Sequence, residues 1–182
     1  TTTFTAIDNL TGSSGADSFT YASAGSLTGG IDGGGDTDEV LGSDQAMTYT
    51  ITGPDSGTVA VNGVTTTITD VDHWTGSSVA DIFNFAGGVL SGDASGLGGG
   101  DAFNITATSG ARELSGGAGD DDFKLSNDSV LTAKIIGGAG LDTLFFGANN
   151  PSPPVGSTDN SLVIGDVDLG DDSAGDTINL SG

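Results

Sequence analysis

The stretch Lys134–Phe146, KIIGGAGLDTLFF, combines the two patterns from which the fold of this chain can be predicted. Its centre, residues 137–140, is a run of glycine and alanine that stands just before Asp142. Glycine adopts positive φ angles without steric cost, so this run predicts a tight turn. Leu144 and Phe146 then stand at alternate positions, which is the period of a strand that buries one face. The predicted local structure is a tight turn followed at once by a short strand.

The same pattern recurs along the chain at a nearly constant spacing. Each Gly- or Ser-rich run is followed by an aspartate, and successive aspartates lie 21, 43, 20, 20, 21 and 34 residues apart. Apolar residues stand two positions after and seven positions before each of them, and four positions after all but one. These aspartates are Asp17, Asp38, Asp81, Asp101, Asp121, Asp142 and Asp176.

A period of 20 to 21 residues that contains two turns and two strand patterns is typical of one coil of a solenoid. We therefore predict an all-β fold, a right-handed parallel β-solenoid of the β-helix or β-roll type, with roughly seven to eight coils. Coils of this kind stack about 4.8 Å apart, with like residues above like. Phe83, Phe103, Phe123 and Leu144 should then form one buried column.

The sequence also contains a second, longer repeat. Residues 1–21 are identical to residues 65–85 at twelve of 21 positions. Between the two copies, residues 47–63 alternate in polarity around Pro54-Asp55-Ser56-Gly57, which predicts a hairpin-like insertion; an irregular coil is the alternative. Residues 147–160 form a Pro-rich loop, either a tolerated surface insertion or a contact or ligand loop. We expect one solenoid domain over residues 1–182.

The charge of the chain excludes several classes of partner. It has 25 acidic and three basic residues and a net charge of −22, which argues against nucleic acid and against anionic lipid. It has no window of about 18 apolar residues, so we expect no membrane insertion. Such acidity favours solubility or the binding of cations. The chain starts at Thr1, so we expect a processed product or a piece of something longer.

Two stretches resemble a known repeat. Residues 116–123, GGAGDDDF, and 137–144, GGAGLDTL, resemble the Gly-Gly-x-Gly-x-Asp-x-apolar nonapeptide of the RTX family, and residues 33–40 and 96–103 are looser copies. The whole pattern is similar to the repetitive β-solenoid regions of large secreted bacterial surface proteins, namely adhesins, haemagglutinin-type proteins and calcium-binding surface proteins. This resemblance implies an extracellular location at the bacterial cell surface.

The resemblance also implies Ca²⁺ held between stacked turns. Its ligands would be the carboxylates of Asp101, Asp121 and Asp142, with Asp38 a weaker candidate, and backbone carbonyls of the turn glycines. Those glycines are Gly117, Gly119, Gly138 and Gly140. The motif occurs once per coil here and not in tandem, so we expect ions on one side of the solenoid at most. The alternative is that the turns close without metal and the aspartates accept hydrogen bonds from backbone N–H groups of the turn.

No catalytic residues are expected. His73 is matched by Asn9 in the internal copy, so we predict that it points outward, and that Trp74 fills the core. Arg112 and Lys134 are about one coil apart and can stack on one face or pair with Glu113 or Asp128. The sequence contains no nucleophile elbow, phosphate-binding loop or zinc-ligand spacing.

The expected function is structural: an extracellular module of a bacterial adhesin, surface layer or filament. We expect it to stack head to tail with identical subunits or to continue into a longer chain. The alternative is a carbohydrate-binding or enzyme-associated module of the polysaccharide lyase or epimerase type, with a glycan or host-surface ligand. Outward aromatic residues are scarce, Phe145 being the clear one, which favours the structural class. A third interpretation is a calcium-dependent folding element for secretion.

Overall fold

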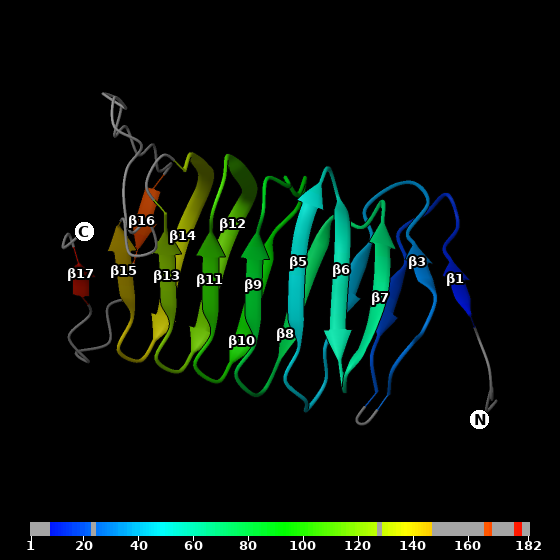
Figure 1. Ribbon diagram of the computed structural model, residues 1–182, viewed down its shortest axis with the longest axis horizontal. Helices are drawn as coiled ribbons and strands as arrows, with labels where there is room; N and C mark the ends of the chain where they lie inside the picture. The colour runs from blue at the N-terminus through cyan, green and yellow to red at the C-terminus, as the bar shows by residue number, and fades with distance from the viewer. Residues whose placement is uncertain (1–7, 23–24, 127–128, 147–165, 169–176, 180–182) are drawn as a thin grey trace.

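The computed structural model describes residues 8–22, 25–126, 129–146, 166–168 and 177–179. This part of the chain is built from strands and turns, with no helix. Consequently it offers no long apolar helix of the kind that crosses a membrane. The strands lie in two sheets that face each other along an elongated body (Figure 1). The predicted Pro-rich loop at 147–160 lies outside the described residues.

Sheet A has ten strands and sheet B has seven. In spatial order, sheet A consists of β1 (Asn9–Thr11), β3 (Gly30–Asp32), β7 (Val64–Thr69), β6 (Ser56–Val61), β5 (Thr48–Gly53), β9 (Ile82–Phe85), β11 (Ala102–Ile105), β13 (Asp122–Leu125), β15 (Thr143–Phe146) and β17 (Thr177–Asn179). Sheet B consists of β16 (Asp166–Asp168), β14 (Leu131–Ala139), β12 (Ser109–Ala118), β10 (Ala94–Gly98), β8 (His73–Ser77), β4 (Glu39–Leu41) and β2 (Ser18–Thr20).

The chain passes from one sheet to the other and back in every coil, so the fold is a β-solenoid of about six turns. Neighbouring strands of successive coils pair in parallel, for example Phe103 with Phe83 and with Phe123. The 20- to 21-residue period is therefore one coil, as predicted. The sequence estimate of seven to eight coils was too high, because part of the chain forms extra strands within one sheet and adds no coils.

Those extra strands are β5, β6 and β7, an antiparallel meander inserted into sheet A (Figure 1). The predicted hairpin over 47–63 is present as β5 and β6, and a third strand follows it. The turn between β6 and β7 is Asn62-Gly63, with φ angles of 52° and 75°. Asn-Gly with two positive φ angles is the preferred two-residue hairpin connection, so this turn could have been found in the sequence.

The meander shifts the repeat by half a coil. Before it, the apolar residue seven positions ahead of the aspartate, such as Ile31, lies in sheet A. After it, the equivalent residue, such as Trp74, lies in sheet B and pairs with Val40. The expectation that like residues stack above like along the whole chain is therefore wrong across the meander. The interval of 43 residues between Asp38 and Asp81 is one and a half coils plus two additional strands, and is not two coils.

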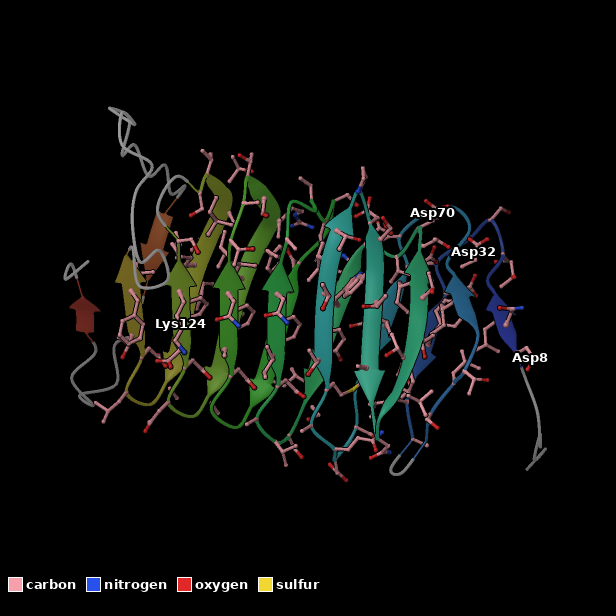
Figure 2. All side chains as sticks on the ribbon, viewed as in Figure 1. Asp8, Asp32, Asp70 and Lys124 are labelled. Carbon is pink, nitrogen blue, oxygen red and sulfur yellow. The ribbon has the colours of Figure 1, made fainter. Side chains whose placement is uncertain are left out.

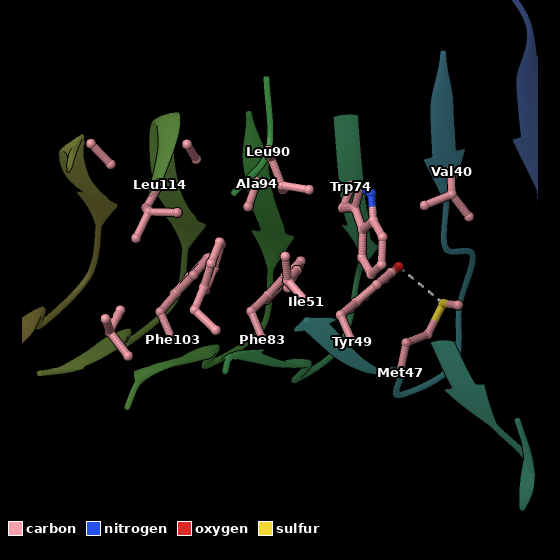
Figure 3. Close-up of a cluster of buried hydrophobic side chains, with 14 of the residues drawn as sticks. Val40, Met47, Tyr49, Ile51, Trp74, Phe83, Leu90, Ala94, Phe103 and Leu114 are labelled. Carbon is pink, nitrogen blue, oxygen red and sulfur yellow. Dashed lines mark hydrogen bonds between the residues drawn. The ribbon is translucent and has the colours of Figure 1, made fainter. Parts of the chain in front are cut away.

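The core fills the space between the two sheets (Figure 3). The rings of Tyr49, Phe83, Phe103 and Phe123 stack in sequence along the solenoid, with centroids 4.5, 4.7 and 4.8 Å apart. Leu144 is buried and continues this column, as predicted. Near Tyr49, Trp74 from sheet B is fully buried, and its indole N–H donates to the Val71 carbonyl at 2.8 Å.

Candidate functional site

The predicted aspartates of the second half form one column along one edge of the solenoid. They stand where the chain turns from sheet B into sheet A, and they are Asp81, Asp101, Asp121 and Asp142. Each is at most 1% exposed. The Asp81 and Asp101 amides donate to Oδ1 of the aspartate one coil later, at 2.8 and 2.7 Å. The Asp121 amide donates to Asp142 Oδ1 at 3.0 Å. The carboxylates thus join successive coils.

A second, shorter column lies on the opposite edge, where the chain turns from sheet A into sheet B. The amide of Asp17 donates to Asp38 Oδ1 at 2.8 Å, and the amide of Asp38 donates to Asp72 Oδ2 at 2.9 Å. Sequence reasoning missed Asp72, because it follows β7 and has no glycine run before it. The half-coil shift caused by the meander is what separates the two columns.

A glycine stands five residues before every column aspartate except Asp72, and it makes room for the carboxylate. A Cβ atom at Gly96 would lie 1.9 Å from Asp101 Oδ2, and one at Gly116 would lie 2.2 Å from Asp121 Oδ2. The same relation holds for Gly33 and Asp38, at 2.5 Å. The first glycine of the repeat is therefore required by the packing of the aspartate as well as by the turn.

The turns fall into two classes that differ at the residue directly after this glycine. Where this residue is serine, its amide donates to the second carboxylate oxygen: Ser13 to Asp17 Oδ2 at 2.5 Å and Ser77 to Asp81 Oδ2 at 2.6 Å. In the turns that lead to Asp38, Asp101 and Asp121 this residue has a positive φ angle; it is Gly34, Leu97 or Gly117. There the buried Oδ2 atom has no hydrogen-bond partner among the described residues.

These buried carboxyl groups have raised pKa values. Burial is the main cause for Asp101, whose pKa rises to about 7, with the nearby charges of Asp121 and Asp81 adding to the effect. Burial likewise raises the pKa of Asp121 to about 6, with Asp142 the largest charged contributor. The pKa of Asp81 is also raised by burial, although hydrogen bonds from the Met47 and Ser77 amides oppose this effect. The column therefore favours neutralisation of its charge, by protons or by cations.

Of the predicted calcium ligands, only the aspartate carboxylates offer atoms suited to a cation. Oδ2 of Asp101 and Asp121 is a buried acceptor without a donor, which is the kind of atom that a cation would coordinate. Turn glycines stack closely instead: a Cβ at Gly138 would lie 2.0 Å from the Gly117 carbonyl oxygen, and the same holds for Gly140 and Gly119. Within the described ranges no three acidic, histidine or cysteine side chains converge as a metal-binding group.

The outer face of sheet B carries the other charged groups that the sequence singled out. His73 points outward, and its Nδ1 accepts a hydrogen bond from the Asp93 amide at 3.1 Å. Arg112 lies 3.9 Å from the Asp93 carboxylate, whereas Lys134 is in register with Glu113. An open surface depression beside His73 is lined by Ala16, Asp17, Ser18, Thr37 and Glu39. The depression brings together the carboxyl groups of Asp17 and Glu39 and the imidazole of His73, and no phenylalanine, tyrosine or tryptophan side chain of the described residues lines it.

Comparison of the chain with protein-family models, with curated proteins and with solved structures finds no match. Its function must therefore be inferred from the two aspartate columns, the stacked core and the outer faces of the two sheets.

Proposed function

We propose that this chain is a rigid structural module of an extracellular bacterial surface protein, such as an adhesin, surface layer or filament. The observation that carries the proposal is the continuity of columns along the solenoid axis. Phe83, Phe103 and Phe123 stack ring on ring, and the aspartates link the same coils through their side chains. Both the core and the edge serve to hold each coil to the next, which suits a spacer that bears load along its length.

The proposed location is tested on intact bacteria that produce the chain. An antibody raised against the purified chain should label unpermeabilised cells, and external protease should remove the label. Antibody against an abundant cytoplasmic protein serves as the control for intact membranes. Labelling that requires permeabilisation would contradict the proposal.

We propose that the solenoid is continued at its ends, either by identical copies stacked head to tail or by further coils of a longer chain. Strands at the end of a parallel sheet carry backbone N–H and C=O groups that are available for further pairing. A heterologous contact of this kind does not close and builds a filament. Electron microscopy of the native material should show fibres with the width of one solenoid, whereas isolated particles one solenoid long would contradict it.

We propose Ca²⁺ as a stabilising ion of the Asp101–Asp121 column. The resemblance to the RTX nonapeptide and the two buried Oδ2 atoms without a donor support it. Calorimetric titration of chelator-treated chain at pH 8 should give heat, and the melting temperature should rise with millimolar Ca²⁺. Asp121→Asn should abolish this response, while Asp17→Asn, in a turn where serine already donates to Oδ2, should leave it intact. A chain that gives no heat and melts at the same temperature with and without Ca²⁺ has no such ion.

A further inference from the structure

The outer face of the β5–β7 meander has an unusual composition. Along each strand the side chains alternate between the core and solvent, so one face of the meander is buried. All but one of the outward residues carry a hydroxyl group. We call them the hydroxyl grid: Thr48, Thr50 and Thr52 on β5, Ser56, Thr58 and Ala60 on β6, and Thr65, Thr67 and Thr69 on β7.

The strand register arranges six of these residues in two rows across the meander, whereas a bulge between Ile51 and Gly53 takes Thr52 out of register. Thr58 lies directly opposite Thr50 on one side and Thr67 on the other, and Ala60 is opposite Thr48 and Thr65 in the same way. Rows of this kind are about 4.5–5.5 Å apart across strands, and residues of one strand that share a face are about 6.8 Å apart. The hydroxyls therefore form a two-dimensional lattice.

The grid is held in place from both sides and from below. β7 pairs with β3 and β5 pairs with β9, so neither outer strand of the meander is an edge. Tyr49, Val59 and Ile68 beneath it are fully buried. The hydroxyls of Thr50, Thr58 and Thr67 make no hydrogen bond to any described residue, which leaves them available to solvent. A face with free hydroxyls at its centre is thus presented outward, whereas the Thr69 hydroxyl at its edge donates to the Ile31 carbonyl at 3.3 Å.

The grid is also free of charge in a chain whose net charge is −22. The outward residues of the next two strands, such as Asn84 and Asn104, are uncharged as well. Charged groups flank this region, with Asp32 on β3 at one side and Lys124 on β13 at the other (Figure 2). A polyanion or polycation therefore has nothing to bind here.

The size and chemistry of the grid also argue against a protein partner. Three strands about 4.8 Å apart and six residues long cover roughly 300 Å², far less than the ~800 Å² per partner of a stable protein interface. No aromatic or arginine side chain of the grid provides an anchor of the kind that dominates protein interfaces. The distinctive property of the grid is the regular spacing of its hydroxyl groups. Such spacing favours a ligand whose own hydrogen-bonding groups repeat on a lattice.

We propose that the hydroxyl grid binds ice. In ice, water oxygens repeat on a lattice whose spacings are of the same order as those between the hydroxyls. Threonine offers a hydroxyl that hydrogen-bonds to lattice water and a methyl group that packs between water molecules. Because the grid is already rigid, ordering water on it requires no ordering of the protein. Charged groups would impose a hydration shell of their own; none belongs to the grid, and the exposed Asp70 lies just beyond Thr69 at its edge.

The test uses the purified full chain and two readouts, the shape and growth arrest of a single ice crystal below its melting point, and incorporation into slowly grown ice. The wild type should facet the crystal and enter the ice. Thr58→Lys places a charge at the centre of the grid and should abolish both effects. Ser115→Lys, which puts the same charge on the outer face of sheet B, should leave both intact. Ala60→Thr completes the grid and should increase the growth arrest.

Circular dichroism and melting temperature of each variant establish that it is folded. A wild type that neither shapes ice nor enters it overturns the proposal, and so does equal loss of activity in Thr58→Lys and Ser115→Lys. If light scattering instead detects a wild-type dimer that Thr58→Lys dissolves, with no effect on ice, the face is a contact between copies and the ice proposal is wrong. These outcomes are independent of the chain's structural role at the cell surface.

Discussion

At the scale of single residues, the column of stacked rings gives the largest expected effect. Phe103 is fully buried between Phe83 and Phe123, with ring centroids 4.7 and 4.8 Å away. Phe103→Ala should lower the free energy of unfolding by about 3–5 kcal/mol, because rings fixed above and below cannot collapse into the cavity. Urea denaturation measures this, with Asn104→Ala on the outer face of the same strand as the control. A loss below ~1 kcal/mol would mean that the rings do not stack.

The glycine ahead of each aspartate can be tested in the same way. A Cβ at Gly116 would collide with Asp121 Oδ2, so Gly116→Ala should destabilise the chain by about 1–3 kcal/mol or more. Gly15→Ala is the matched control, because the nearest atom to its Cβ is 3.9 Å away. Equal melting temperatures for the two variants would show that the carboxylate does not occupy the space beside Gly116.

The raised pKa of Asp101 predicts a pH dependence of stability. The folded-state pKa is about 7 and the ordinary value is 3.8, so the folded chain binds this proton more tightly than the unfolded chain does. The resulting stabilisation is complete below pH 3.8 and is lost as the pH rises through about 7. In the absence of metal, the wild type should lose stability relative to Asp101→Asn between about pH 4 and pH 8. A difference between the two proteins that stays constant with pH would contradict the raised pKa.

At the scale of elements, the meander depends on its turns. Gly63 has a φ angle of 75°, and a Cβ there would meet no atom within 4 Å. Gly63→Ala should therefore reveal the cost of the backbone conformation alone, about 1–2 kcal/mol. Hydrogen exchange should quicken in β6 and β7 and stay unchanged in β13, which lies several coils away. Uniform quickening in all strands would indicate that the meander does not open separately.

At the scale of the whole molecule, the question is whether the coils before the meander and the coils after it unfold together. Tyr49 of the meander stacks on Phe83 and lies 5.9 Å from Trp74, so the core is continuous across the half-coil shift. We expect one cooperative unfolding transition. The fluorescence of Trp74, the single tryptophan of the chain, should follow the same curve as circular dichroism of all the strands. Two separate transitions would show that the shift divides the solenoid into independent units.

The sequence by itself determined the coil, its period and most of its core. Strand alternation and turn glycines are local, so the spacing of apolar residues is enough to assign Phe83, Phe103, Phe123 and Leu144 to one buried column. The core position of Trp74 was also predicted from its fixed distance to the turn, whereas the burial of Asp101 and Asp121 was not. These features depend on neighbours in sequence, which a repeat displays many times over.

The tertiary structure alone decided what depends on pairing between distant segments. The sequence shows Asp17 and Asp81 at the same position of two copies that share twelve of 21 residues, yet they lie in columns on opposite edges, because the repeat is displaced by half a coil across the meander. The sequence also did not reveal the partners of the Asp38 and Asp101 carboxylates, since each accepts a hydrogen bond from the amide of an aspartate in the adjacent coil. The hydroxyl grid likewise arises only when β5, β6 and β7 pair in register, because sequence order does not specify which strand lies beside which.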